Sequence, residues 1–125
     1  MELLGAFPDI EDLAMELLEP AGPTVLATPE VITPPLIVIR RTGGFDDVIT
    51  DTPRIQVDVF GSTRRQAADL AETCRQIILA SPATGIGHAS IDQAWTETAP
   101  TFVAYDDRNT QRYVATYGLA LRRAR

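Results

Sequence analysis

The sequence contains no lysine, and all eleven of its basic residues are arginines. Seventeen acidic residues outnumber them, which gives a formal net charge of −6 at pH 7. A general nucleic-acid binder needs a basic surface to neutralise phosphates, so this charge balance argues against that class. Arginine is favoured in bidentate and interface pairing, but a GC-rich genome produces the same bias and is the simpler explanation.

Cysteine and long apolar runs are also scarce. The single cysteine, Cys74, cannot form an internal disulfide, and its place among apolar residues predicts a small buried side chain. No apolar run approaches the roughly 20 residues that span a bilayer, and the short acidic N-terminus is unlike a secretory signal. We therefore expect no membrane partner. The 125 residues, 45% of them hydrophobic and 22% charged, fit one domain, residues 1–125, with one core.

Residues 54–80 form the stretch around which the other segments can be placed. Apolar residues alternate with polar ones up to Phe60, which predicts a strand, and then recur at spacings of three and four, which predicts a helix. The predicted apolar stripe of this helix consists of Ala67, Leu70, Ala71, Cys74, Ile77 and Ile78. Arg75 falls on the opposite face. The Gly-Ser-Thr segment, residues 61–63, stands where the period changes and predicts a hydroxyl cap.

The other elements follow from apolar spacing and from turn residues. An acidic segment, residues 8–19, has helical spacing and ends at Pro20. Gly43-Gly44 and residues 45–53 are expected to form a long polar loop between two strands, which together make an antiparallel hairpin with a protruding tip. Further strands are expected at 36–41, 89–97, 102–105 and 110–123, with a short extended piece at 24–27, an interruption at Pro100 and a turn at 106–109.

This order of elements predicts an α+β fold. We expect a mainly antiparallel sheet of about four strands with two helices packed on one face. The last strand should place Tyr113, Ala115, Tyr117, Leu119 and Leu121 on one face, and the strand at 89–97 should do the same with Ile91, Gln93 and Trp95. The opposite sheet face, which includes Gln56, Asp58 and Phe60, should meet solvent or a partner.

Candidates for catalysis are few. His88 is the sole histidine and lies in a glycine-rich segment, and no carboxylate is placed by the sequence to orient its imidazole. Ser90 follows two residues later, but a Ser-His-Asp arrangement has no support. The Gly-Ile-Gly segment, residues 85–87, lacks the third glycine of a dinucleotide fingerprint and the lysine of a P-loop. We expect no catalytic residue and no cofactor.

A metal site also has little support. No set of cysteine and histidine residues has the spacing of a metal centre. Three carboxylates, Asp46, Asp47 and Asp51, stand close together in the sequence but lack the spacing of a calcium loop. They are more typical of a solvated turn, so no metal is expected.

Four pieces of the chain, taken in order, form a pattern of shape rather than a set of chemical motifs. They are P-D-I-E-D-L-A-M-E-L-L, P-P-L-I-V-I-R-R-T-G-G, R-I-Q-V-D-V-F-G-S-T-R-R-Q-A-A-D-L-A and A-P-T-F-V-A-Y-D-D-R-N-T-Q-R-Y-V-A-T-Y-G-L-A-L-R-R. In this pattern the chain resembles, over nearly its whole length, the tail terminator proteins of long-tailed (siphovirus) bacteriophages, which are near in form to neck or head-to-tail connector proteins.

The resemblance implies a structural virion protein and no active site. Such a subunit forms a ring, commonly of six, that caps the head-proximal end of the tail tube, stops tube polymerisation and provides the surface for head joining. Its expected partners are itself, the tail tube protein and the head-to-tail connector or neck proteins, in the virion and, during assembly, in the host cytoplasm. DNA would only pass through the lumen, and an acidic subunit suits a conduit that must not grip phosphate.

Three alternatives stay open. A connector between portal and tail differs from a terminator in its partners and not in its physics. A small-molecule-binding α+β domain would need a defined pocket with a strongly perturbed acid or histidine. A nucleic-acid binder would need six arginines to converge on one face, namely Arg40, Arg41, Arg64, Arg65, Arg108 and Arg112.

The predicted interface centres on the loop that follows Gly43-Gly44. Phe45 stands at its tip, where it is a candidate anchor for a neighbouring subunit or the tube. Asp46 and Asp47, with Arg108 and Arg112, are candidates for ion pairs at the rim of that contact. The alternative is that Phe45 folds back on its own hairpin.

Overall fold

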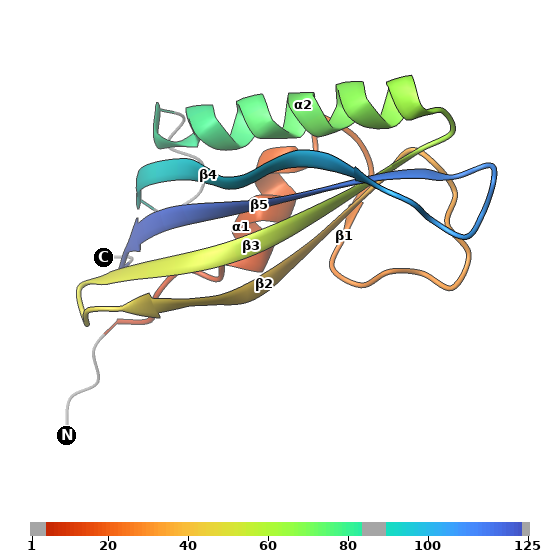
Figure 1. The fold of residues 1–125 in the computed structure, drawn as a ribbon. Coiled ribbons are helices and arrows are strands. Elements are labelled where there is room, and N and C mark those ends of the chain that lie inside the picture. Colours follow the sequence, from red (N-terminus) through yellow and green to blue (C-terminus); the bar gives the residue numbers. More distant parts are fainter. Residues whose placement is uncertain (1–4, 84–89, 124–125) are drawn as a thin grey trace.

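A computed structural model describes residues 5–83 and 90–123. Within these residues the chain forms two α-helices, a short 3-10 turn at Ser81–Ala83 and one five-stranded sheet (Figure 1). The elements are α1 (Ile10–Leu18), β1 (Thr24–Val25), β2 (Leu36–Asp46), β3 (Thr50–Gly61), α2 (Arg64–Ala80), β4 (Ser90–Val103) and β5 (Gln111–Arg122). The predicted α+β class is confirmed, with five strands in place of about four.

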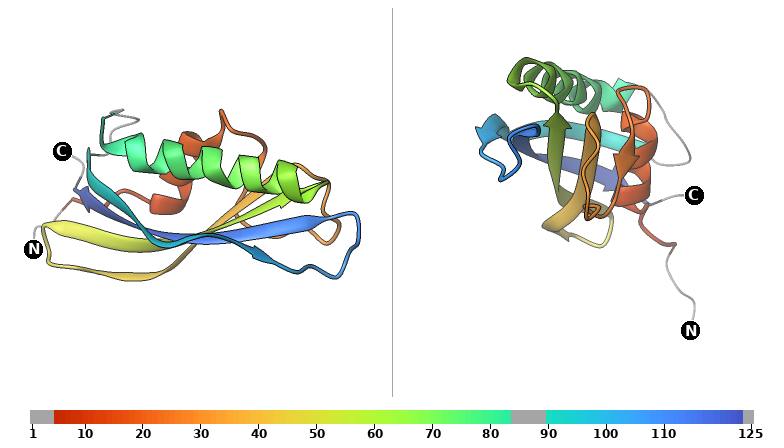
Figure 2. Two further views of the ribbon diagram at one scale, coloured as in Figure 1. Left: turned by 45° about the horizontal axis from the view of Figure 1, so that its top comes forward. Right: turned by 90° about the vertical axis from the view of Figure 1, so that its right-hand side faces the viewer.

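The strand order in the sheet is β1-β2-β3-β5-β4. The fifth strand is β1, whose two residues pair in parallel with Ile37 and Val38, while all other neighbours are antiparallel. Both helices cover the same face of the twisted sheet, which we call the helix face (Figure 2). The other face is called the open face.

Side-chain caps fix where each helix begins. Asp9 accepts hydrogen bonds from the backbone amides of Glu11 and Asp12 and so caps α1. The hydroxyl of Thr63 accepts from the amide of Gln66 at 3.0 Å and caps α2, as the Gly-Ser-Thr segment predicts. Each cap satisfies a backbone donor that has no partner inside its helix.

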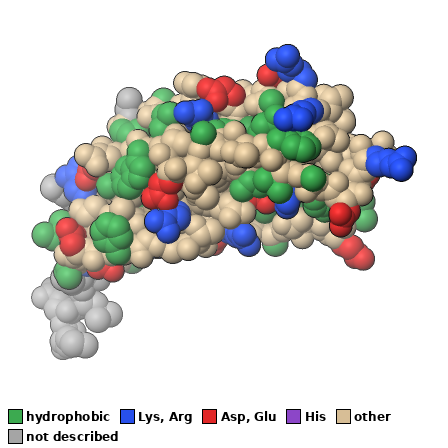
Figure 3. Space-filling view, viewed as in Figure 1, with side chains coloured by type: hydrophobic (Ala, Val, Ile, Leu, Met, Phe, Trp, Pro, Cys, Tyr) green, Lys and Arg blue, Asp and Glu red, His purple; other side chains and the backbone are tan. Residues whose placement is uncertain are grey.

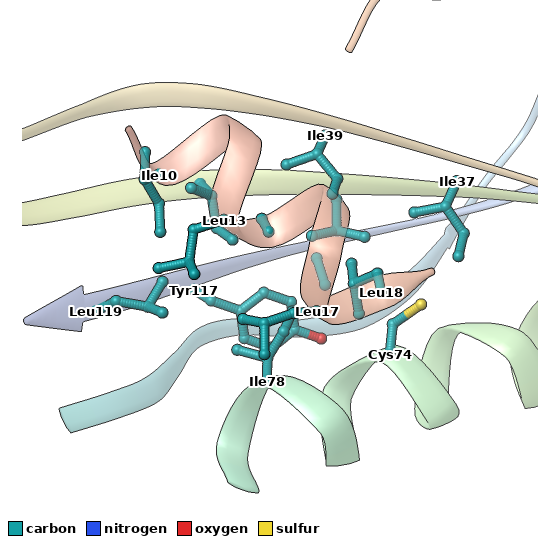
Figure 4. Packing of buried hydrophobic residues seen from close by; sticks show 14 of the residues in the cluster. Ile10, Leu13, Leu17, Leu18, Ile37, Ile39, Cys74, Ile78, Tyr117 and Leu119 are labelled. Atoms are coloured by element: carbon teal, nitrogen blue, oxygen red, sulfur yellow. The ribbon is translucent and has the colours of Figure 1, made fainter. Parts of the chain in front are cut away.

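The core lies between the helix face and the two helices (Figure 4). The side chains of Ala67, Ala71, Cys74 and Ile78 are buried and come from α2, so the predicted stripe is confirmed at these positions. Leu70 and Ile77 are only half-buried and lie at its margin. The predicted face of β5 is confirmed by buried Ala115, Tyr117, Leu119 and Leu121 and half-buried Tyr113.

The predicted antiparallel hairpin is confirmed, but the predicted extent of its loop, residues 45–53, is wrong. β2 continues to Asp46 and β3 begins at Thr50, so most of the segment is a paired hairpin. Gly43 and Gly44 do not form the turn: both have positive φ and lie beside a register shift in β2, which is a bulge. The hairpin is also held from the other side, because Thr50 pairs with Arg122 of β5.

Phe60 was expected to meet solvent or a partner on the open face, and this prediction is wrong. Phe60 is 1% exposed and packs with Leu36 and Val38 in a second, smaller apolar cluster. The proline-rich connector that follows β1 contributes Ile32 to this cluster. The ring of Tyr105 also meets Phe60 edge to face, with centroids 5.4 Å apart.

β4 runs without the predicted break at Pro100, although its pairing with β5 has three register shifts. The first shift, between Ile91 and Gln93, changes which side chains point toward the helices. As a result Ala94, and not Gln93 or Trp95, joins Ile91 against the core. Trp95 pairs with Gly118 of β5, and its indole lies over that glycine on the open face.

Candidate functional site

The turn between β2 and β3, with the residues beside it, presents three large apolar side chains to solvent. Phe45 is 69% exposed, Val48 57% and Ile49 70%. We call residues 45–50 the β2–β3 tip. In Figure 3 hydrophobic and acidic side chains gather at the left end of the molecule, over this hairpin. Phe45 does not fold back on its own hairpin, because a side chain in that position would be covered.

The two predicted interface acids at the tip hold the turn together. Asp46 Oδ1 accepts from the amide of Val48 at 2.9 Å. Asp47 Oδ1 accepts from the amides of Ile49 and Thr50 at 3.1 and 2.7 Å. Val48 itself has φ 78°, a conformation that is uncommon for a β-branched residue. The carboxylates therefore fix a strained turn that points apolar side chains outward.

Two arginines brace the tip from behind. Arg41 donates to both oxygens of Asp51 at 2.8 and 2.9 Å, and Asp51 is 4% exposed. The hydrogen bond to Asp51 raises the pKa of the Arg41 guanidinium. Arg123 donates to the backbone carbonyl of Val48 and stacks over the ring of Phe7 at 4.1 Å. These contacts join the tip to β5 and to the segment before α1.

The other two predicted interface residues, Arg108 and Arg112, lie toward the opposite end of the sheet. Arg108 is exposed in the turn between β4 and β5, which is at the far end from the β2–β3 tip (Figure 1). Arg112 is near the start of β5 and pairs with Phe60, the penultimate residue of β3. Within one subunit the structure therefore does not bring these arginines to Asp46 and Asp47.

Arg112 belongs to a pocket of 350 Å³ on the open face, which we call the basic pocket. Its guanidinium lies 4.0 Å from Asp58 and 5.5 Å from the centre of the Tyr105 ring. Its Nε is buried and has no hydrogen-bond partner among the described residues. The residues that line the pocket are Leu26, Ala27, Thr28, Val38, Arg40, Gln56, Asp58 and Arg112.

The six arginines required by the nucleic-acid alternative do not converge. Arg41 faces Asp51 behind the β2–β3 tip, whereas Arg64 lies over Phe102 with 4.2 Å between guanidinium and ring centre. Arg112 is on the open face, whereas Arg64 belongs to α2, which covers the helix face. Such a distribution gives no continuous basic surface of the kind that phosphate binding needs.

The small-molecule alternative calls for a pocket that contains a strongly perturbed acid or histidine. Burial raises the pKa of the Cys74 thiol to about 12 and also raises the pKa of the Tyr117 phenol. Neither side chain lines a described pocket; a groove of 710 Å³ beside α1 is lined instead by Asp12, Met15 and Glu16 among others. Residues 5–83 and 90–123 contain no acid, histidine or cysteine cluster suited to a metal. His88 and residues 85–87 lie outside the described residues.

No helix in the described residues is both long and apolar enough to cross a bilayer.

The sequence predicted that Phe45 would be exposed at the tip, but it did not predict the exposure of Val48 and Ile49 or the existence of the basic pocket. Two adjacent β-branched residues inside a run of Asp and Thr were the available signal for the tip. The pocket had no such signal, because its lining comes from the connector, β2, β3 and β5 and is assembled only by the fold.

One comparison with known proteins identifies a family. A family model described as phage tail termination protein matches residues 6–94, which is more than half of the chain. No curated protein matches the sequence. Among solved structures, a chain from the virion of a native gene transfer agent particle superposes with a TM-score of 0.58 at 8% identity, covering 88% of this chain and 84% of that chain. At this identity the superposition shows a shared fold.

Proposed function

Because the chain belongs to the phage tail termination protein family, and is thus a structural protein of a phage tail, we propose that it is the terminator at the head-proximal end of the tail tube. In this role, copies of the chain assemble into a ring, most simply of six. The ring caps the tube, stops its polymerisation and presents the surface to which the head is joined. DNA passes through the lumen without specific binding.

The observation that carries the proposal is the family match over residues 6–94. The fold shared with a virion chain supports it, since the superposition extends over most of both chains. The open face and the exposed β2–β3 tip give the subunit two different surfaces, as a ring with head-to-tail contacts requires. The partners proposed are the chain itself, the tail tube protein and the connector or neck proteins.

The proposal includes no catalytic role, cofactor or metal. The family is one of structural tail proteins. We also propose that residues 1–125 act as one domain. The protein would be made in the host cytoplasm and would then remain in the virion.

Imaging of assembled tails tests the position. Cryo-electron microscopy of particles that carry a tagged copy should show a single ring at the head-proximal end of the tube. Density for the protein along the tube, between the portal and a separate terminator, or nowhere in the particle would overturn the proposal; the second of these would make it a connector.

Deletion of the gene gives an independent readout. If the ring stops polymerisation, a strain that lacks this protein should make tail tubes of variable and excessive length, and these tubes should carry no head. Tubes of normal length in the deletion strain would contradict a terminator. Complementation by the unaltered chain controls for effects on neighbouring genes.

A further inference from the structure

The β2–β3 tip is built to hold a strained shape. A positive φ at a β-branched residue costs free energy, and such strain persists at functional sites because the surroundings impose it. At Val48 the imposing contacts are the turn bonds of Asp46 and Asp47, the Asp51–Arg41 pair and the Arg123 bond to the carbonyl. A rigid apolar surface loses little conformational entropy when it binds, so the tip is preorganised for a partner.

The basic pocket has the complementary character. Its apolar wall comes from Leu26 and Val38, and two guanidiniums face one carboxylate. Arg40 is exposed and makes no ion pair with any described residue, while Arg112 Nε lacks a hydrogen-bond partner. The pocket thus has one more positive than negative group, and the tip has two carboxylates.

The tip and the pocket of one chain cannot meet. Val38 and Phe45 lie on the same strand, seven positions and therefore roughly 23 Å apart. We propose that the β2–β3 tip of one copy enters the basic pocket of a second copy, with Phe45, Val48 and Ile49 against its apolar wall. Asp46 and Asp47 then face Arg40 and Arg112 of the second copy.

This contact is heterologous, since it joins two different surfaces of the same chain. Repetition of such a contact closes a ring when the rotation between copies is suitable, so the inference rests on the proposed ring. The groove beside α1 is a poorer receiver for the same tip. It is lined by Asp12, Glu16 and Glu19, which would repel the two carboxylates.

Cysteine cross-linking tests the contact directly. Ile49→Cys marks the tip and Thr28→Cys marks the pocket, and native Cys74 is buried and does not interfere. The two single variants are mixed and oxidised, both as concentrated protein and in assembled tails. We expect covalent dimers that join positions 49 and 28, and a ladder of larger species when one chain carries both cysteines. Gln76→Cys, exposed on α2, replaces Thr28→Cys in the control and should give none.

Charge-neutral variants test the electrostatic part. Asp46→Asn retains an oxygen that can accept from the amide of Val48 but removes the charge, and Arg40→Gln removes a charge from the pocket. Both should lower the yield of the 49–28 cross-link and its sensitivity to salt. Asp69→Asn, exposed on α2, is the matched control and should leave the yield unchanged.

The outcomes separate this contact from the proposed function. A ring imaged at the tube end without any 49–28 cross-link overturns the contact and leaves the terminator assignment standing. Cross-links between two copies of position 49 would also overturn it, because they indicate a symmetric contact. The 49–28 cross-link in a protein that is absent from the tube end would keep the contact and overturn the assignment.

Discussion

Arg41 and Asp51 form a bidentate pair behind the β2–β3 tip, with Nη1 and Nη2 of the guanidinium 2.8 and 2.9 Å from the two carboxylate oxygens. The amide of Arg41 also donates to the carboxylate of Glu11 in α1. One residue of β2 therefore connects the hairpin, the first helix and the turn that bears the exposed apolar side chains. The orientation of the tip depends on this residue pair.

Asp51→Ala should destabilise the protein by about 1–3 kcal/mol, because it leaves the guanidinium without its partner beside a buried position. Chemical denaturation measures the change, and hydrogen exchange should locate the loss at residues 45–50. The control is Glu72→Ala. Glu72 and Arg75 form an exposed pair at 3.7 Å on α2, so its loss should cost no more than about 0.5 kcal/mol. Equal effects of the two variants would contradict a bracing role.

Gly118→Ala should destabilise the sheet, because a Cβ at this position would lie 2.4 Å from two ring carbons of Trp95. Displacement of a packed indole typically costs about 1–3 kcal/mol. Thermal unfolding of the two single variants and of Gly118→Ala/Trp95→Ala completes a double-mutant cycle. The double variant should be less destabilised than the sum of the two single ones. Additive effects would mean that the ring moves away freely.

Ile78→Ala should cost about 2–5 kcal/mol, since Ile78 is 1% exposed and packs in the core as part of the α2 stripe. Leu70→Ala should cost less, because Leu70 is only half-buried at the stripe margin. Arg75→Ala, on the outer side of α2, should change stability by about 0.5 kcal/mol or less. Urea denaturation gives the order, and an Arg75 variant that is the least stable of the three would show that the helix is rotated.

The protein should lose stability in alkaline solution. Burial raises the pKa of Cys74 from 9.0 to about 12, so the folded state holds this proton more tightly than the unfolded state. The resulting contribution is complete below pH 9 and is lost as the pH rises toward about 12, at up to about 1.4 kcal/mol per pH unit. Denaturation across this range should show a shallower fall for Cys74→Ala. Tyr117, whose pKa burial also raises, should still contribute in that variant.

The sequence was sufficient where local signals and tertiary structure agree. The α2 stripe, the Thr63 cap and the alternation in β5 were all predicted, because amphipathic spacing and capping act over a few residues. Residues 45–53 were predicted as a loop, since three Asp and one Pro fall within these nine residues and both residue types are depleted in strands. Pairing of Thr50 with Arg122 and the Arg41–Asp51 contact override that preference, and neither is visible in a local window.

Two other predictions, about which side chains face the helices and which face solvent, were wrong for reasons that lie outside the local sequence. The register shift after Ile91 moves Ala94 to the helix face, and a strict alternation cannot anticipate one extra residue. Phe60 was assigned to an exposed face because its strand alternates, but the connector returns over that face and buries it. The basic pocket depends on the same connector. Its arginines, Arg40 and Arg112, were among the candidate binding residues in the sequence, but only the fold shows that they lie in the same pocket.

The strand order has a consequence for synthesis. β5 is the last strand to be made, yet it lies between β3 and β4 and pairs with both of them. Until residues 111–122 have left the ribosome, the two earlier strands have no neighbour on that side and much of the core is unformed. Chains cut short before β5 should therefore fail to form this sheet, and we expect that incomplete products do not compete with finished subunits for places in an assembly.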